Sequence, residues 1–233
     1  MAVNSGGSSI KYELFSIEED KEKSLARGSV KRLYRSDSFW EGEKEGIKSK
    51  KEVPHLDHEK GLQLIIDVLT QEGPLRSIQE IEAVGIKLIN GGTRVTQTSF
   101  IDSTVIQALQ DLSGITSVHN PPSLLAIEMF QKILSRTPLV GVFETTFHLS
   151  IPLPYRTYGL PWELSEKYGL KKLGFHGNSH RYIAERITTL TSRNQKVISC
   201  HLGSGCSVCA IKEGKSLDIS SGFTPQSGTI MST

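Results

Sequence analysis

Several features that define other protein classes are scarce in this chain of 233 residues. It has only three cysteines, an odd number that argues against a disulfide framework and for a reducing compartment. No apolar run approaches the roughly 20 residues that span a bilayer. The first residues, MAVNSGGSSIKYELF, lack the basic and apolar regions of a signal peptide. We therefore expect a cytoplasmic protein that has no membrane partner.

The excess of positive over negative residues is also small, since the formal net charge is +2 at pH 7. So small a positive net charge does not by itself indicate a nucleic-acid partner, and no zinc-finger, RNP-like or basic-helix pattern occurs. The remaining composition, 37% hydrophobic and 22% charged, is that of an ordinary globular protein with a substantial core.

Hydrophobic periodicity predicts strands first, then mixed elements, then strands again. The alternation of Ile10, Tyr12 and Leu14 predicts a strand, and the charged segment 37–54 is either an exposed loop or a polar hairpin. The predicted strands are 1–3, 10–17, 25–35, 81–91, 138–147, 196–202, 206–211 and 215–220, and the predicted helices are 55–73, 99–114, 120–136 and 177–191. A Pro- and Tyr-rich loop, 150–163, separates the last predicted helix from the elements before it.

The order of elements contains a faint repeat. A strand, a turn of small residues, a strand, a charged bend and a strand occur both near the start of the chain and over 196–220. A duplicated unit of this kind can place its two small-residue turns on opposite sides of a cleft, where they would hold a phosphate chain.

The segment CHLGSGCSVCAI, 200–211, has three possible roles. Cys206-x-x-Cys209 has the spacing of a zinc site, with His176, His180 and His201 not far away in sequence. Residues 206–211 are predicted as a strand, however, in which residues three apart point to opposite faces. Because a second cysteine pair is also missing, buried small residues are the favoured interpretation of these cysteines.

The other two roles of this segment concern its glycines. HLGSGCS, 201–207, and NSGGSS, 4–9, each offer backbone N–H groups to an anion, and Lys11 follows the second stretch as a cation. Neither stretch has the Walker A spacing or the G-x-G-x-x-G pattern. A plain hairpin turn therefore remains the alternative for each.

GFHGNSHRY, 174–182, places His176 and His180 four residues apart at the start of a predicted helix. Asn178 or Ser179 is the expected N-cap, and His176 would precede the helix, so the two histidines need not share a helical face. A helix N-terminus favours anions. A structural histidine or a simple cap remains the alternative to a catalytic role.

Taken together and in this order, these stretches resemble the acetokinase family of acetate and propionate kinases. The resemblance runs from about residue 2 to residue 233. It is carried by the stretches VNSGGSSIKY, NGG at 90–92, HNPP at 119–122, VFETTFH, YGLPWELSEKYGLKKLGFHGNSHRYIAER and CHLGSGCSVCAIKEGKSLDISSGFTPQSG.

The resemblance implies an α/β, actin-like ATPase (ribonuclease H-like) duplicated fold. Residues 1–148 would form the first domain, and 149–233 the start of an incomplete nucleotide-binding domain. The implied activity is acetate kinase: Mg²⁺- or Mn²⁺-dependent phosphoryl transfer from ATP to acetate or another short carboxylate, in a homodimer. Two further hypotheses are a truncated remnant, or half of a split kinase that needs a partner chain for a missing C-terminal half. A sugar-kinase-like relative ranks lower.

The resemblance also assigns roles to individual residues. Asn4 would lie at the metal, Lys87 would bind the substrate carboxylate, and Glu144 and His176 would be catalytic. The implied ATP-binding residues are Lys11, His201, Leu202, Gly203, Ser204 and Gly205. A short carboxylic acid is already ionised at pH 7, so we expect Glu144 to orient Mg²⁺ or its waters rather than to remove a proton.

The chain departs from the family pattern at several of these positions. Ile86 and Lys87 stand where the family has histidine and arginine, and Asn90 replaces a histidine. Glu144 replaces an aspartate, and Ser204 replaces an asparagine. Lysine keeps the positive charge of arginine but loses its two-pronged donor geometry.

Overall fold

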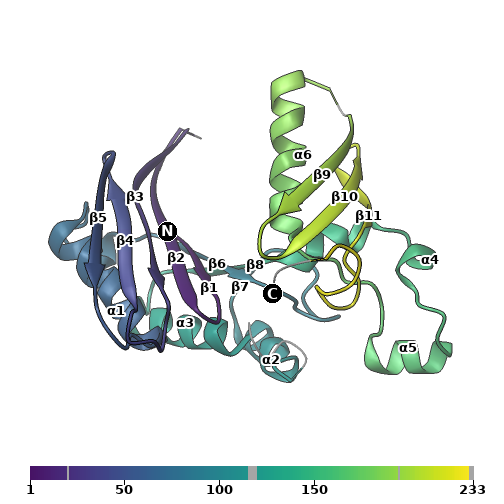
Figure 1. Cartoon of the computed structure of the whole chain (residues 1–233), viewed down its shortest axis with the longest axis horizontal. Coiled ribbons are helices and arrows are strands. Elements are labelled where there is room, and N and C mark those ends of the chain that lie inside the picture. The colour runs from purple at the N-terminus through teal and green to yellow at the C-terminus, as the bar shows by residue number, and fades with distance from the viewer. Residues whose placement is uncertain (20, 115–119, 194, 231–233) are drawn as a thin grey trace. The chain divides into compact units, whose positions relative to one another are not determined.

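The computed structural model describes residues 1–19, 21–114, 120–193 and 195–230, and it divides into two compact units (Figure 1). Unit 1 comprises Met1–Leu88 and Ser99–Val142, and unit 2 comprises Ile89–Thr98 and Phe143–Thr233. The predicted domains, 1–148 and 149–233, divide the chain differently, because segments 89–98 and 143–148 belong to the second compact unit. That domain division stays a prediction.

Unit 1 is built on an eight-stranded sheet with the order β5-β4-β3-β2-β1-β6-β8-β7. Strands β1 to β5 form a series of antiparallel pairs, β1 with β2 and so on to β5. On its other side, β1 pairs parallel with β6. The strands are β1 (Ala2–Ser5), β2 (Ser9–Glu18), β3 (Lys21–Lys31), β4 (Phe39–Lys44), β5 (Ile47–Glu52), β6 (Val84–Leu88), β7 (Ser99–Phe100) and β8 (Leu139–Phe143). Segment 37–54 is therefore a polar hairpin, one of the two predicted alternatives.

The helices of unit 1 cover one face of this sheet. Helix α1 packs on β2, and α3 packs on β1 and β6 (Figure 1). Ile10, Tyr12 and Leu14 are buried, as their alternation predicts. The helical elements are α1 (His58–Asp67), the π-turn η1 (Val68–Glu72), the 3-10 turn η2 (Ile78–Glu80), α2 (Ser103–Asp111) and α3 (Asn120–Ile133).

Local capping explains where these helices begin. The Asp57 carboxylate accepts a hydrogen bond from the Lys60 backbone N–H at 2.7 Å, and Asp102 caps α2 through the Val105 N–H at 2.9 Å. The helical run that starts at His58 ends before Gly73, as predicted. Of the predicted stretch HNPP, His119 lies outside the described residues.

Unit 2 packs helix α6 along β9 of a three-stranded sheet with the order β11-β10-β9 (Figure 1). Its small core contains Ala184 of α6 together with Cys209, Ile211 and Ile219 of the sheet. The elements are η3, a 3-10 helix (Glu144–Ser150), α4 (Leu153–Arg156), α5 (Trp162–Tyr168), α6 (Gly177–Thr191), β9 (Lys196–Leu202), β10 (Cys206–Lys212) and β11 (Lys215–Ile219).

Three sequence predictions need correction in this region. The strand predicted over 138–147 ends at Phe143 and continues as the 3-10 helix η3. The predicted Pro- and Tyr-rich loop contains α4 and the start of α5. The N-cap of α6 is His176, rather than Asn178 or Ser179, because both of those residues are already helical. None of the helices described is long and apolar enough to cross a membrane.

Candidate functional site: a glycine turn and its histidines

The glycine turn of unit 2 joins β9 to β10 and lies against the imidazole of His176. Within the turn, the Gly203 N–H donates to the Gly205 carbonyl oxygen at 3.0 Å. A Cβ atom placed on Gly205 would lie 3.0 Å from His176 Nε2. Glycine at this position therefore lets the backbone approach the ring. The predicted residues His176 and His201 to Gly205 are thus neighbours in the fold.

The backbone of His176 has an uncommon conformation. Its φ angle is 58°, in the left-handed region, and it occupies the N-cap position of α6 without a side-chain capping bond. Non-glycine residues seldom adopt this conformation unless the surrounding structure imposes it. Here the side chain is directed away from the helix end toward the sheet, where its Nδ1 lies 2.8 Å from Ser207 Oγ.

His176 and His201 form a stacked pair of imidazole rings. Their centroids are 4.0 Å apart, and their planes are inclined by 12°. His201 Nδ1 lies 3.0 Å from Ser179 Oγ in the first turn of α6. This contact and the stacking hold His201 beside the glycine turn.

Two further histidines, His148 and His180, are completely buried behind this pair. His180 lies between two serines, with Nδ1 2.9 Å from Ser199 Oγ and Nε2 2.9 Å from Ser207 Oγ. Burial, reinforced by the neighbouring histidines, lowers the pKa of His180 from 6.5 to about 4. His180 is therefore neutral at pH 7.

His148 makes an equivalent but separate set of contacts. Its Nδ1 lies 2.9 Å from Ser216 Oγ, and its Nε2 lies 3.1 Å from the Phe175 carbonyl oxygen. Burial lowers the pKa of His148 to about 4. Since a carbonyl oxygen can only accept, Nε2 of the neutral ring carries the proton and Ser216 donates to Nδ1.

The cysteines of β10 have the strand placement that the sequence predicts. Burial alternates along β10, so Cys206 and Cys209 face opposite sides of the sheet. Cys209 is buried, and its burial raises the pKa of the thiol to about 11. Cys206 is only half-buried, so the predicted burial of the Cys206–Cys209 pair holds for Cys209 alone; Cys200 on β9 is exposed.

Glu144 lies at the start of η3, directly against the beginning of α6. A Cβ atom on Gly177 would overlap the Glu144 carbonyl oxygen, so glycine is required where the two segments meet. The adjacent Thr145 is tied to the NGG turn, because its N–H donates to Ile89 O at 3.2 Å and its hydroxyl to Asn90 Oδ1 at 3.4 Å. Asn90 therefore holds two segments of unit 2 together.

The predicted residues of unit 1 gather on one face of its sheet. Asn4 and Lys11 are directly opposite each other on β1 and β2. Lys87 lies on β6, one residue after Ile86, which pairs with Val3 of β1. Buried and half-buried residues alternate along β6, and Lys87 is one of the half-buried ones. All three lie on the face opposite the one that contains Ile10, Tyr12 and Leu14.

Lys11 also lines a shallow hollow of about 680 Å³ on strands β2 to β5. Two cations of this hollow have acidic partners, since Lys31 pairs with Glu41 at 2.5 Å and Arg27 with Glu43 at 3.0 Å. Among the described residues, no ion pair involves Lys11. Its ammonium group is therefore suited to an anionic ligand.

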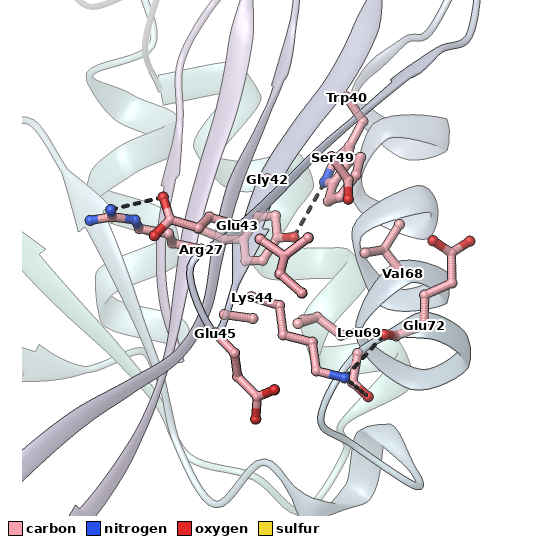
Figure 2. A pocket seen from close by; sticks show the side chains of 14 residues that line it. Arg27, Trp40, Gly42, Glu43, Lys44, Glu45, Ser49, Val68, Leu69 and Glu72 are labelled. Atoms are coloured by element: carbon pink, nitrogen blue, oxygen red, sulfur yellow. Dashed lines mark hydrogen bonds and ion pairs between the residues drawn. The ribbon is translucent and has the colours of Figure 1, made fainter.

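A second hollow of unit 1, of about 270 Å³, contains none of the predicted site residues (Figure 2). Trp40, Val68 and Leu69 give it apolar walls, and Lys44 reaches across to the carbonyl oxygens of Glu72 and Gly73 at 3.4 Å. Its lysine is already bound by the protein, so we do not take it as the candidate site.

Comparison with known proteins identifies the family. The sequence matches the acetokinase family over residues 1–233. The chain belongs to the acetokinase family. It is 40% identical to an acetate kinase of Oceanobacillus iheyensis and 41% identical to one of Halothermothrix orenii. Each alignment covers 100% of this chain but only 59% and 60% of the relative.

Solved acetokinase structures give the same result for the fold. A propionate kinase from Francisella tularensis superposes with a TM-score of 0.90 at 29% identity, and Porphyromonas gingivalis acetate kinase with 0.87 at 34%. Each alignment covers 99% of this chain and 59% of the other. The predicted actin-like α/β fold is confirmed.

The sequence of this family member did not reveal the buried partners of its histidines. Ser199 and Ser207 occupy inward positions of β9 and β10, and His148 lies in the 3-10 helix η3 that follows β8. The available signal was serine at positions where strand alternation predicts apolar residues, facing a histidine-containing helix. His180 was noted near the cysteine pair and at the start of the predicted helix, but without its serine partners.

The residues predicted to lie at a metal fit a divalent ion only in part. Asn4 in unit 1 and Glu144 in unit 2 each offer an oxygen donor of the kind that Mg²⁺ prefers. Among the described residues, no three His, Cys, Asp or Glu side chains are grouped so as to hold a metal ion. These residues therefore fit a metal that is bound largely by substrate phosphates and water rather than by a protein cage.

Proposed function

We propose that this chain supplies the phosphate-handling residues of a kinase that transfers a phosphoryl group from ATP to acetate or another short carboxylate. A carboxylate oxygen attacks the γ-phosphorus, the bond to the bridging oxygen of ADP breaks, and the products are an acyl phosphate and ADP. No proton has to be removed from the acceptor, because it is already ionised at pH 7. The observation that carries the proposal is His176 lying against the Gly203–Gly205 turn in a chain that matches the family throughout.

Within unit 2, the residues would stabilise the charge of the phosphates. The turn, with His201, Leu202, Gly203, Ser204 and Gly205, would present backbone N–H groups and a hydroxyl to phosphate oxygens. His176 Nε2 would donate a hydrogen bond to the transferring phosphoryl group. Such fixed donors stabilise phosphoryl transfer through electrostatics and positioning more than through covalent chemistry.

Within unit 1, Lys11 would bind a phosphate of ATP, and Lys87 would bind the substrate carboxylate. Asn4, and Glu144 of unit 2, would hold Mg²⁺ or Mn²⁺ through oxygen atoms, and the ion when bound would neutralise phosphate charge. Homodimer formation, the absence of nucleic-acid and membrane partners, and a cytoplasmic location stay predictions.

Trapping of acyl phosphate by hydroxylamine tests the proposal. The chain is incubated with Mg²⁺, ATP and either acetate, propionate or butyrate, and the hydroxamate is measured. We expect His176→Gln to lower the rate at least tenfold, whereas His55→Gln, at an exposed residue of unit 1, leaves it unchanged. Equal rates in the wild type and His176→Gln would contradict the assigned role of His176.

A second candidate function follows from the length of the match. The chain spans about 59% of the curated relatives that it matches. It would then act as one part of a split kinase and turn over only with the complementary part, or it would be a non-catalytic remnant.

Complementation distinguishes these two possibilities. The part of the Oceanobacillus iheyensis enzyme that lies beyond the matched region is added to this chain in the same hydroxamate assay. Activity that appears only with both polypeptides supports the split kinase, and it should be lost again with His176→Gln. Binding of the two polypeptides without any activity would favour the remnant.

A further inference from the structure

A continuous chain of hydrogen bonds connects His176 to the interior of unit 2. It runs from Ser199 Oγ to His180 Nδ1 at 2.9 Å, from His180 Nε2 to Ser207 Oγ at 2.9 Å, and from Ser207 Oγ to His176 Nδ1 at 2.8 Å. Ser199 on β9 and Ser207 on β10 both face α6 and are almost fully buried. The three inner members are therefore shielded from water.

The number of hydrogens limits how the hydrogen bonds of this chain can be arranged. A neutral imidazole has one donor and one acceptor nitrogen, and each serine hydroxyl has a single hydrogen. Because Ser207 Oγ lies between His180 and His176, it can donate to only one of the two rings. If Ser207 donates to one ring, all the hydrogen bonds run either outward, from Ser199 toward His176, or inward, from His176 toward Ser199. If both rings instead donated to Ser207, its own buried hydrogen would have no acceptor among the described residues.

The surroundings of Ser199 favour the outward arrangement. Among the described residues, His180 is the single hydrogen-bond partner of the Ser199 hydroxyl. If the bonds ran inward, His180 Nδ1–H would donate to Ser199, and the Ser199 hydrogen would be left without an acceptor. A buried donor without a partner is strongly unfavourable, whereas an unused lone pair on a hydroxyl is less so.

We propose that Ser199, His180 and Ser207 form a positioning relay that holds His176 in the tautomer with its hydrogen on Nε2. In this arrangement Ser207 donates to His176 Nδ1, so Nε2–H is the donor that faces the Gly203–Gly205 turn. His180 acts through Ser207, so it is a positioning residue rather than a catalytic one.

Two other contacts fix the plane of the ring that this relay orients. His176 is stacked on His201 at 4.0 Å, and the backbone of Gly205 lies against its Nε2 edge. A rotated ring would lose both the stacking and the bond to Ser207. The binding of a phosphoryl oxygen by Nε2–H rests on the proposed function. The tautomer itself is a property of unit 2 alone.

The tautomer can be read directly by ¹⁵N NMR. The full chain is labelled with ¹⁵N-histidine, and long-range ¹H–¹⁵N spectra are recorded at pH 7.5, with His176 assigned by its loss in His176→Gln. We expect Nδ1 of His176 to resonate as an unprotonated nitrogen and Nε2 as a protonated one. A protonated Nδ1 with a bare Nε2 in the wild type would overturn the proposal.

Variants of the relay separate positioning from a merely structural role. In His180→Gln the amide NH₂ can still donate to Ser207, so the tautomer of His176 should be retained. In His180→Leu and Ser207→Ala the two tautomers should mix, and the two nitrogen shifts should move toward each other. Ser216→Ala is the matched control, because it removes the serine partner of the other buried histidine, His148, and should leave His176 unchanged.

Other outcomes also decide the question. Should His180→Leu not fold, Ser207→Ala carries the test, since it deletes one oxygen and leaves both rings in place. A folded Ser207→Ala with an unchanged His176 tautomer would contradict the relay. Where kinase activity is measurable, Ser207→Ala should lower kcat more than it raises KM, and Ser216→Ala should change neither. Absence of activity in every form would count against the proposed function and would leave the NMR result intact.

Discussion

Burial divides the four histidines of unit 2 into an inner and an outer pair. His148 and His180 lose their water contacts and are held as neutral rings by serine and backbone partners. His176 and His201, at the surface of the same cluster, remain only partly buried beside the glycine turn. Neutral interior rings can make the edge-to-face contacts His148–His180 and His180–His201 without the repulsion that several imidazolium groups would create.

These buried rings predict that unfolding is sensitive to mild acid. The pKa of His148 and that of His180 are about 4 in the folded chain, against an ordinary 6.5. Between pH 6.5 and pH 4 the unfolded chain therefore binds more protons, so the free energy of unfolding falls as pH falls through this range. His148 alone accounts for about 3 kcal/mol at pH 4. Denaturant titrations from pH 8 to pH 4 measure the loss.

A non-titrating replacement of His148 provides the control. In His148→Gln the amide NH₂ can still donate to the Phe175 carbonyl oxygen, as Nε2 does in the native ring. This variant should be less stable than the wild type at pH 7.5, but its stability should fall less steeply on acidification. Equal slopes for the two proteins would mean that His148 does not cause the acid sensitivity.

At the level of elements, the start of α6 depends on how closely two backbones meet. Gly177 begins the helix where the Glu144 carbonyl oxygen leaves no room for a side chain. The preceding His176 must adopt the left-handed conformation to enter the helix at this point. The same close approach therefore positions both residues that the resemblance names as catalytic.

We expect Gly177→Ala to lower the free energy of unfolding by roughly 2 kcal/mol or more, because the added methyl forces the helix away from η3. Gly159→Ala, in the same unit and with no atom within 4 Å of the new methyl, should change it by less than about 0.5 kcal/mol. Chemical denaturation monitored by circular dichroism compares the two. A Gly177→Ala variant as stable as Gly159→Ala would show that η3 and the start of α6 can move apart without a loss in the free energy of unfolding.

At the level of the whole molecule, one face of the unit 2 sheet carries apolar side chains into solvent. Ile198 and Leu202 of β9 are 68% and 74% exposed, and Cys200 between them is exposed as well. Strand β9 is also an edge of its sheet. Exposed apolar edges of this kind promote association between copies of a chain.

We therefore expect the 233-residue chain to self-associate as its concentration rises, and the double variant Ile198→Lys/Leu202→Glu to associate less. Ile47→Lys is the control, because Ile47 is 71% exposed but lies on a lysine-rich strand that already resists pairing. Sedimentation velocity over a concentration series gives the comparison. Equal association of the wild type and the double variant would exclude this face as the cause.

The sequence by itself determined most of the elements and the family of this protein. Alternation along β2 and β10 and helical spacing in α1 are local patterns, since each residue's side follows from its place in a regular element. The collinear motifs likewise singled out His176 and the Gly203–Gly205 turn without any coordinates. Local patterns do not say where a strand stops, so the change to 3-10 helix at Glu144 was missed.

Only the tertiary structure decided how the site is supported. Ser199, Ser207 and Ser216 are unremarkable in sequence, and they acquire a role because the sheet faces them toward histidines 19 to 68 residues away. The tautomer of a histidine depends on which hydrogen-bond partners it meets, and contacts between distant segments cannot be read from periodicity. The N-cap of α6 was decided in the same way, because the fit of Gly177 against η3 prevailed over the capping preference of Asn178 and Ser179.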